Sequence, residues 1–176
     1  MSWVAFLRAV NVGGRTVKMD RLRAVFEALR FGDVSTFIAS GNVRFTSRGE
    51  GAALEKRIER ALAEAFGFEI TTFLRSTTDL AALADDGPFD AASGSTVIVG
   101  FLKSTPAAAA VARLATLQTP DDELRVLGRE VWWRRRGGIG ETKLAGGLLE
   151  RTLGVPMTMR NITTVRKLAR LPEGRA

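Results

Sequence analysis

Along the first half of the chain, short runs of consecutive apolar residues alternate with segments in which apolar residues recur at helical spacing. The apolar runs, which are typical of buried strands, cover Trp3–Val10, Val34–Ile38, Val43–Ser47 and Phe68–Arg75. Between them, apolar residues recur at every third or fourth position, which predicts two amphipathic helices over Lys18–Arg30 and Gly51–Phe66, ended by Gly32 and Gly67. The resulting order, β-α-β-β-α-β, is that of a ferredoxin-like unit.

The second half repeats this order. The predicted strands are Thr96–Leu102, Glu123–Leu127, Glu130–Arg135 and Pro156–Met159. The predicted helices are Pro106–Gln118 with Thr105 as its N-cap, Glu141–Leu153 and a final helix over Asn161–Leu171. A short helix over Asp79–Ala84, capped by Ser76 or Thr77, and loops rich in Asp, Gly, Pro and Ser separate the two halves.

These patterns predict an α+β fold of two ferredoxin-like βαββαβ units in tandem plus a C-terminal helix. We expect the first unit over residues 1–76, a linker with a short helix over 77–94, and the second unit with the C-terminal helix over 95–176. The repeat lies in the order of the elements, because the two halves share little sequence identity.

Composition narrows the chemistry. The 176 residues include no Cys, His or Tyr, which excludes disulfides, thiolate nucleophiles, zinc sites built on Cys or His, and Ser-His-Asp triads. We therefore expect no metal and no cofactor. No apolar run approaches the ~20 residues that span a bilayer, and the start lacks the basic flank of a signal peptide. The sequence thus predicts a cytoplasmic protein without a membrane partner.

The positive charge is concentrated at one end of the sequence. The formal net charge is +7, and residues 129–176 hold eleven basic and four acidic residues, whereas residues 1–128 are balanced. Local positive charge favours an anionic partner, either nucleic acid or a phosphorylated small molecule. The alternative is a basic surface that serves solubility alone.

Two loops are expected to share one end of the first sheet. In a ferredoxin-like unit, the connection after the first strand and the turn between the second and third strands lie together. This brings a first set of candidate ligand-binding residues into one place: Arg8, Asn11, Gly13, Gly14, Ser40 and Asn42. A glycine-rich turn before a helix exposes N–H groups that favour an anion. Alternatively, the glycines only permit tight turns, with Asn42 in a left-handed turn.

The strand Glu130–Arg135 predicts a nucleic-acid surface. Neighbouring residues of a strand face opposite sides, so one tryptophan of Trp132 and Trp133 faces the helices and the other the open side of the sheet. Trp132 with Arg134 and Arg136 is then a candidate base-stacking platform. The alternative is that this tryptophan packs against the other half of the protein.

Further candidate ligand-binding residues lie near the C-terminal end. Lys143 follows a glycine segment that lacks the residue order of a Walker phosphate loop. Arg160 precedes the start of the final helix, where a cation can hold a phosphate or a carboxylate. Asn161 is a candidate of the same kind, and its alternative role is to cap that helix.

The motifs of both ends together resemble the DUF-1697 family, a domain of unknown function. The N-terminal motifs are Leu7-Arg8-Ala9-Val10-Asn11-Val12-Gly13-Gly14, Met19, Leu22 and Ser40-Gly41-Asn42-Val43-Arg44-Phe45. The C-terminal motifs are Thr142-Lys143-Leu144, Leu149-Glu150-Arg151, Leu153-Gly154-Val155-Pro156, Thr158-Met159-Arg160-Asn161 and Thr163-Thr164-Val165. Ala9 and Ile162 depart from the family pattern, which usually has Gly and Trp there. The resemblance implies ferredoxin-like halves and no established activity.

Three classes of function stay open. The first, which the sequence supports best, is non-catalytic binding of an anionic ligand, nucleic acid or a phosphorylated metabolite, through glycine-loop and arginine-rich surfaces. The second is a protein-interaction module, including a homo-oligomer, that uses its open sheet faces. The third is a small cofactor-independent enzyme acting on a phosphate- or carboxylate-bearing substrate, for which only a lysine or a Ser40–Lys143 pair offers reactive groups.

Overall fold

The chain divides into two compact units. The computed structural model describes residues 1–8, 10, 16–37, 41–89, 94–137, 142, 144 and 146–171. One unit comprises Met1–Ala81 together with the end of the chain from Lys167, and the other comprises Ala82–Arg166. Within the described residues, the units contain two four-stranded antiparallel sheets, six α-helices and one short 3-10 helix.

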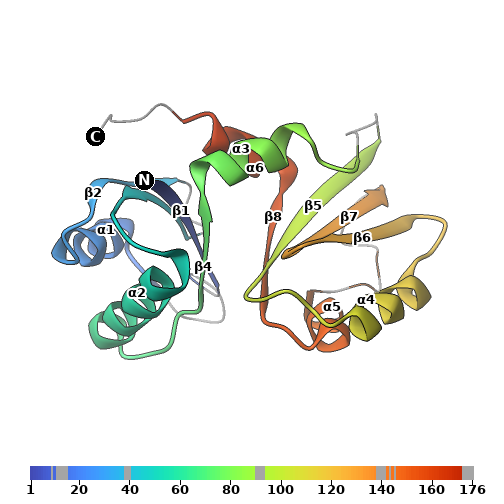
Figure 1. Ribbon diagram of the computed structural model, residues 1–176, viewed down its shortest axis with the longest axis horizontal. Helices are drawn as coiled ribbons and strands as arrows, with labels where there is room; N and C mark the ends of the chain where they lie inside the picture. The colour runs from blue at the N-terminus through green and yellow to red at the C-terminus, as the bar shows by residue number, and fades with distance from the viewer. Residues whose placement is uncertain are drawn as a thin grey trace. The chain divides into compact units, whose positions relative to one another are not determined.

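The first unit has a sheet in the order β2-β3-β1-β4. Its strands are β1 (Ser2–Leu7), β2 (Gly32–Phe37), β3 (Asn42–Thr46) and β4 (Thr72–Ser76). The helices α1 (Met19–Ala28) and α2 (Gly51–Phe66) lie on one face of this sheet (Figure 1). The core between them is made of aliphatic and Phe side chains from both layers, such as Leu22, Phe26, Phe45, Ile58 and Leu62.

Two arginines join the helices of this unit, each by donating to a carbonyl at the C-terminal end of the other helix. Arg21 at the start of α1 donates to the carbonyl of Ala65 at the end of α2. Arg57 of α2 donates in turn to the carbonyl of Leu29, the C-cap of α1 (2.6 Å). The last carbonyls of a helix lack partners within the helix, so each guanidinium satisfies one of them and fixes the antiparallel helix pair.

The second unit has a sheet in the order β6-β7-β5-β8. Its strands are β5 (Ser95–Leu102), β6 (Asp122–Leu127), β7 (Glu130–Arg136) and β8 (Met157–Asn161). The helices α4 (Ala108–Leu114) and α5 (Gly146–Leu153) lie side by side on one face (Figure 1), and the 3-10 helix η1 (Ala115–Leu117) follows α4. Trp133 of β7 belongs to the core on this face, with Leu114, Leu149 and Leu153.

One further helix follows the fourth strand of each sheet. Helix α3 (Thr77–Asp85) follows β4, and helix α6 (Ile162–Ala169) follows β8. The predicted Ser76 cap is confirmed, because the N–H of Asp79 donates to Ser76 Oγ (3.0 Å). Asn161 caps α6 in the same manner, since its Oδ1 accepts from the N–H of Thr163 (2.8 Å). Among the described residues, no helix has the length and apolar character needed to cross a membrane.

Several helix boundaries differ from the predictions, and three of the differences concern a stop, a cap and a start named above. Helix α1 ends at Ala28, so Gly32 begins β2 instead of stopping the helix. The Thr105 cap is wrong, because α4 begins after Ala107, whose carbonyl accepts the first helical bonds. The start of α5 at Glu141 is also wrong. Thr142 is not helical, because its hydroxyl donates to Asp122 (3.4 Å) and accepts from the N–H of Leu144 (3.0 Å).

Candidate functional site

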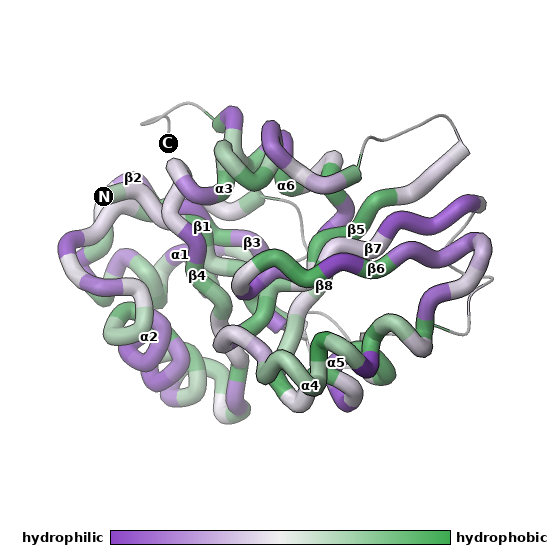
Figure 2. The backbone as a smooth tube through the Cα atoms, turned by 45° about the vertical axis from the view of Figure 1, so that its right-hand side comes forward, coloured by the Kyte–Doolittle hydropathy of each residue, from purple (hydrophilic) through white to green (hydrophobic). Residues whose placement is uncertain are grey.

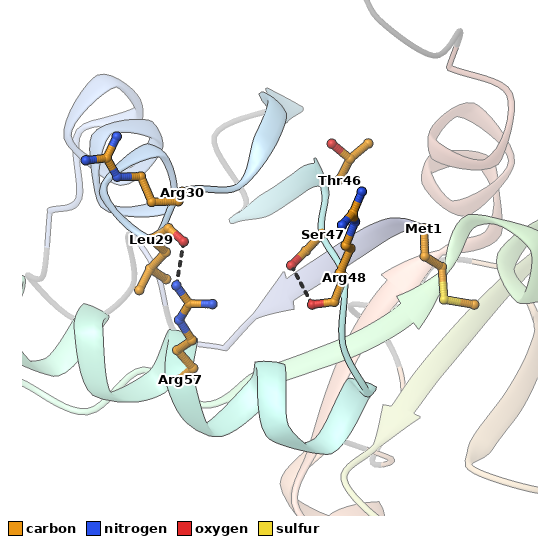
Figure 3. Close-up of a pocket in the computed structure, with 7 residues that line it drawn as sticks. All are labelled: Met1, Leu29, Arg30, Thr46, Ser47, Arg48 and Arg57. Carbon is orange, nitrogen blue, oxygen red and sulfur yellow. Dashed lines mark hydrogen bonds between the residues drawn. The ribbon is translucent and has the colours of Figure 1, made fainter.

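An open pocket of about 480 Å³ lies in the first unit (Figure 3). Its lining comes from four segments: the end of α1, the end of β3 with the connection that follows, the middle of α2, and the start of the chain. The lining residues are Met1, Leu29, Arg30, Thr46, Ser47, Arg48 and Arg57. Three of the seven are arginines, so we call this site the arginine pocket.

Arg30 stands in a conformation that normally selects glycine. It follows the C-cap residue Leu29 of α1 and has φ +59°. A side chain in this left-handed region costs about 1 kcal/mol, which is why helices often place Gly there. The strained conformation sets Arg30 on the wall of the pocket. Such outliers are found preferentially at functional sites.

Arg57 is held from two sides. Its Nη2 donates to the carbonyl of Leu29 (2.6 Å), and its Cζ lies over the ring of Phe31, 5.1 Å from the centroid. Phe31 in turn stacks on Phe45, with 4.5 Å between ring centroids and an interplanar angle of 23°. Arg57, Phe31 and Phe45 therefore follow one another in a stack, with the guanidinium at one end.

Arg48 enters the pocket from the connection between β3 and α2, where the Ser47 hydroxyl donates to the Arg48 carbonyl (3.2 Å). Across the part of the chain that the structure describes, no carboxylate lies within ion-pair distance of Arg30, Arg48 or Arg57. The nearby Asp33 accepts a hydrogen bond from the Thr46 hydroxyl (3.1 Å). The pocket therefore has a positive lining.

The arginines of β7 have a different environment. In Figure 2 the hydrophilic part of β7 runs beside a hydrophilic part of β6, and in the register of the two strands Arg135 is opposite Asp122. Arg135 Nη1 donates to both carboxylate oxygens of Asp122 (2.8 and 3.0 Å), and Trp133 Nε1 donates to Oδ1 (2.9 Å). Burial by itself raises the pKa of Asp122, but the hydrogen bonds from Arg135, Trp133 and Thr119 outweigh it and lower the pKa.

The next pair on these strands is also an ion pair. Glu123 binds Arg134 of β7 and Arg125 of its own strand, the latter at 2.8 Å. The hydrogen bond from Arg125 is the largest cause that lowers the pKa of Glu123. Both guanidiniums lie over Phe89, 4.8 and 5.0 Å from the ring centroid. Most of the positive charge on β7 is thus paired.

The three residues predicted to bind nucleic acid therefore differ in their exposure and in their pairing. Trp132 is only 2% exposed, and Gly87 approaches its ring so closely that a Cβ there would lie 2.5 Å from it. Arg134 is paired with Glu123, and Arg136 is exposed at the end of β7. Nucleic-acid binding by these residues stays a prediction, and it requires the segment around Gly87 to move off Trp132.

The loops at the end of the first sheet lie together where they are described. The N–H of Leu7 donates to the carbonyl of Gly41 (2.8 Å), and Gly41 needs its glycine, since φ is +74° and a Cβ would lie 3.1 Å from Val10. Asn42 is fully buried in β3, where its side chain donates to the Phe37 carbonyl (3.0 Å). Arg8 is half-buried just beyond β1. The other predicted residues of this end lie outside the described part: Asn11, Gly13, Gly14 and Ser40.

The remaining predicted residues belong to the second unit. Lys143 lies outside the described residues. Arg160 Nη1 donates to Thr158 Oγ1 (2.9 Å) and to the Met159 carbonyl (2.8 Å), and burial lowers the pKa of Arg160 to about 10. Asn161 caps α6. A role of these three residues in ligand binding stays a prediction. No group of three acidic side chains in the described residues is arranged to hold a metal ion.

The sequence reasoning missed the arginine pocket. Residues 1–128 have a balanced charge, so the net charge gave no indication of this site. Its three arginines are 18 and 9 positions apart in the sequence but line the same pocket in the fold. One local signal was present: Arg30 follows the last apolar position of a predicted helix, where Gly is usual. The interpretation of Gly32 as the helix stop concealed it.

Comparisons with known proteins extend the picture. A sequence profile for the family described as "Protein of unknown function (DUF1697)" matches residues 1–132. No curated protein sequence matches the chain. Among solved structures, the chain is similar to the conserved bacterial protein SP0830 from Streptococcus pneumoniae, with 26% identity and a TM-score of 0.69. That similarity covers 96% of this chain and 97% of the other, so it includes the second unit.

Proposed function

The chain belongs to the DUF1697 family of proteins of unknown function, and we propose that it binds an anionic, phosphate-bearing ligand without transforming it. The observation that carries this proposal is the arginine pocket. Three guanidiniums line one hollow, and no described carboxylate pairs with them. Guanidinium groups bind phosphate through paired, charge-assisted hydrogen bonds, which supply both affinity and geometry.

A binding role fits the lining better than a catalytic one. General acid or base chemistry needs a group whose pKa lies near the working pH. Arginine side chains stay protonated, and no other side chain in the lining titrates near neutral pH. The lining can therefore hold and orient an anion.

We also propose that each unit is a ferredoxin-like fold, which gives the pocket a rigid support. The strand orders β2-β3-β1-β4 and β6-β7-β5-β8, with every neighbouring pair antiparallel, support this assignment. Arg57 then projects from a helix packed on the sheet, while Arg30 follows the end of helix α1 and Arg48 follows the end of strand β3.

The test compares two arginines that differ only in their surroundings. Binding of inorganic phosphate, adenosine 5′-monophosphate and a short single-stranded RNA is measured by titration calorimetry at low and at high salt. We expect Arg48→Gln to weaken phosphate-bearing ligands about tenfold, because it removes charged hydrogen bonds worth ~1.5 kcal/mol. The control, Arg134→Gln, changes the net charge equally and should leave the affinity within about twofold.

Two results would contradict the proposal. One is that none of the three ligands binds to the wild-type protein. The other is an equal loss in both variants, which would mean that net charge, and not the pocket, attracts the ligand. Circular dichroism of each variant verifies that it is folded.

A further inference from the structure

We infer that the ligand of the arginine pocket is a nucleoside monophosphate or a close analogue, with its phosphate on Arg48 and its planar base on Arg57. This inference rests on the anion-binding function proposed above and assigns different roles to these two arginines. It follows from the size of the pocket, from the contacts that hold Arg57, and from the position of Arg48 across the hollow from Arg57.

The pocket is larger than a phosphate group needs. A volume of about 480 Å³ corresponds to roughly sixteen water molecules at ~30 Å³ each. Inorganic phosphate alone would leave most of this space filled with water. A ligand that fills it carries a body several times larger than its anionic group, and the volume lies within the ~300–1,000 Å³ range of small-molecule sites.

Arg57 is built as a stacking surface. One of its nitrogens is occupied by the Leu29 carbonyl, and its guanidinium carbon lies over the Phe31 ring. Arg57 is also one of the residues that line the pocket. A planar ring placed there would continue the stack of Phe45, Phe31 and Arg57, because nucleobases stack on guanidinium planes as they do on aromatic rings.

Arg48 suits the phosphate. Its side chain has no hydrogen-bond or ion-pair partner among the described residues, so its donors are available to a ligand. Arg30 adds positive charge beside Leu29, with its guanidinium turned away from Arg48 (Figure 3). Figure 3 shows Arg48 across the hollow from Leu29 and Arg57, so a ligand that reaches both sides spans the pocket. The side chain of Met1, which is 72% exposed, adds an apolar surface for the ligand body.

A mononucleotide fits this arrangement better than a nucleic-acid strand. A strand needs a row of cations that follows its backbone. The three arginines instead line one hollow and come from three separate segments. The arrangement therefore suits one anionic group joined to one planar body.

The test separates the base from the phosphate. Affinities of adenosine 5′-monophosphate, ribose 5-phosphate and inorganic phosphate are measured by titration calorimetry on the full chain. We expect adenosine 5′-monophosphate to bind at least about tenfold more tightly than ribose 5-phosphate, because stacking of one base contributes ~1–3 kcal/mol. In Arg57→Lys, which keeps the charge but lacks the plane, this ratio should fall to about two, with ribose 5-phosphate binding little changed.

The matched control is Arg21→Lys. Arg21 has the same structural contacts as Arg57: it donates to a helix-terminal carbonyl, that of Ala65, and its Cζ lies over the Phe66 ring at 5.0 Å. It does not line the pocket. Arg21→Lys should therefore lower the melting temperature about as much as Arg57→Lys does and should leave the ligand ratio unchanged.

The outcomes distinguish the two proposals. If the three phosphate compounds bind with equal affinity, the inference about the base is overturned while the anion-binding function stands. If the ratio of the adenosine 5′-monophosphate affinity to the ribose 5-phosphate affinity falls equally in Arg57→Lys and Arg21→Lys, the stacking role of Arg57 is overturned, while the anion-binding function stands. If none of the compounds binds, the anion-binding function itself fails.

Discussion

Two groups of arginines in this protein have opposite surroundings. In the first unit, Arg30, Arg48 and Arg57 line a pocket with no carboxylate partner among the described residues. In the second unit, Arg134 and Arg135 of β7 bind Glu123 and Asp122 of the neighbouring strand. The more basic stretch of sequence therefore contains arginines that are largely neutralised, and the stretch without excess charge contains those that are available.

The reason is the geometry of an antiparallel pair. Residues on neighbouring strands face each other at close range, so opposite charges there form pairs that stabilise the sheet. Asp122 and Arg135 are almost fully buried, so their pairing also removes the cost of two isolated buried charges. The arginine pocket contains no such partners, which leaves its charge for a ligand.

The largest expected effect comes from breaking the buried pair. Asp122→Ala should lower the free energy of unfolding by about 3 kcal/mol or more, because it leaves Arg135 charged and buried and removes the acceptor of Trp133 Nε1. Urea denaturation followed by tryptophan fluorescence measures the change. Arg48→Ala in the pocket should change it by less than about 0.5 kcal/mol, and an equal loss in both variants would remove the contrast.

A second effect is the pH dependence of the unfolding free energy that the two paired carboxylates cause. The pKa values of Asp122 and Glu123 are lowered in the folded state below their ordinary values of 3.8 and 4.5. A group with a lowered folded pKa stabilises the protein above its unfolded pKa, and this stability is lost as the pH falls through the folded pKa. The free energy of unfolding should therefore decrease as the pH falls below about 4.5, the ordinary pKa of Glu123.

The variant Glu123→Gln tests whether these residues cause the drop. Urea denaturation at a series of pH values should give a shallower acid branch for this variant than for the wild type. A branch of unchanged slope would show that other carboxylates dominate. Phosphate binding at the pocket should keep its affinity in Glu123→Gln at neutral pH, since the ion-pair partners of Glu123 among the described residues are Arg125 and Arg134, which do not line the pocket.

The smallest effect on stability has the opposite sign. Arg30→Gly should raise the free energy of unfolding by about 0.5–1 kcal/mol, because glycine adopts φ +59° without strain. The same change should weaken phosphate binding about two- to threefold, because it removes one positive charge from the lining of the pocket. Arg30→Ala is the matched variant, since it loses the charge but keeps the strain. It should weaken binding equally without the gain in stability, and a gain in both variants would contradict the strain argument.

Periodicity predicted the elements of this fold well. The helix Gly51–Phe66 has the predicted bounds, and all eight predicted strands correspond to observed strands. These elements depend on local spacing of apolar residues, which is visible in the sequence. The start of α5 was wrong because Thr142 is tied to Asp122, a residue 20 positions away, and local spacing contains no information about such a contact.

The candidate site depended on contacts that no local pattern records. The sequence could identify the basic and aromatic residues of β7, but not that Gly87 covers Trp132 or that Glu123 neutralises Arg134. It contained Arg30, Arg48 and Arg57, but not their meeting around one hollow. The sequence alone established the helices and strands and which charged residues are present. Tertiary structure decided which charges are free, because that depends on distances between segments that fold together.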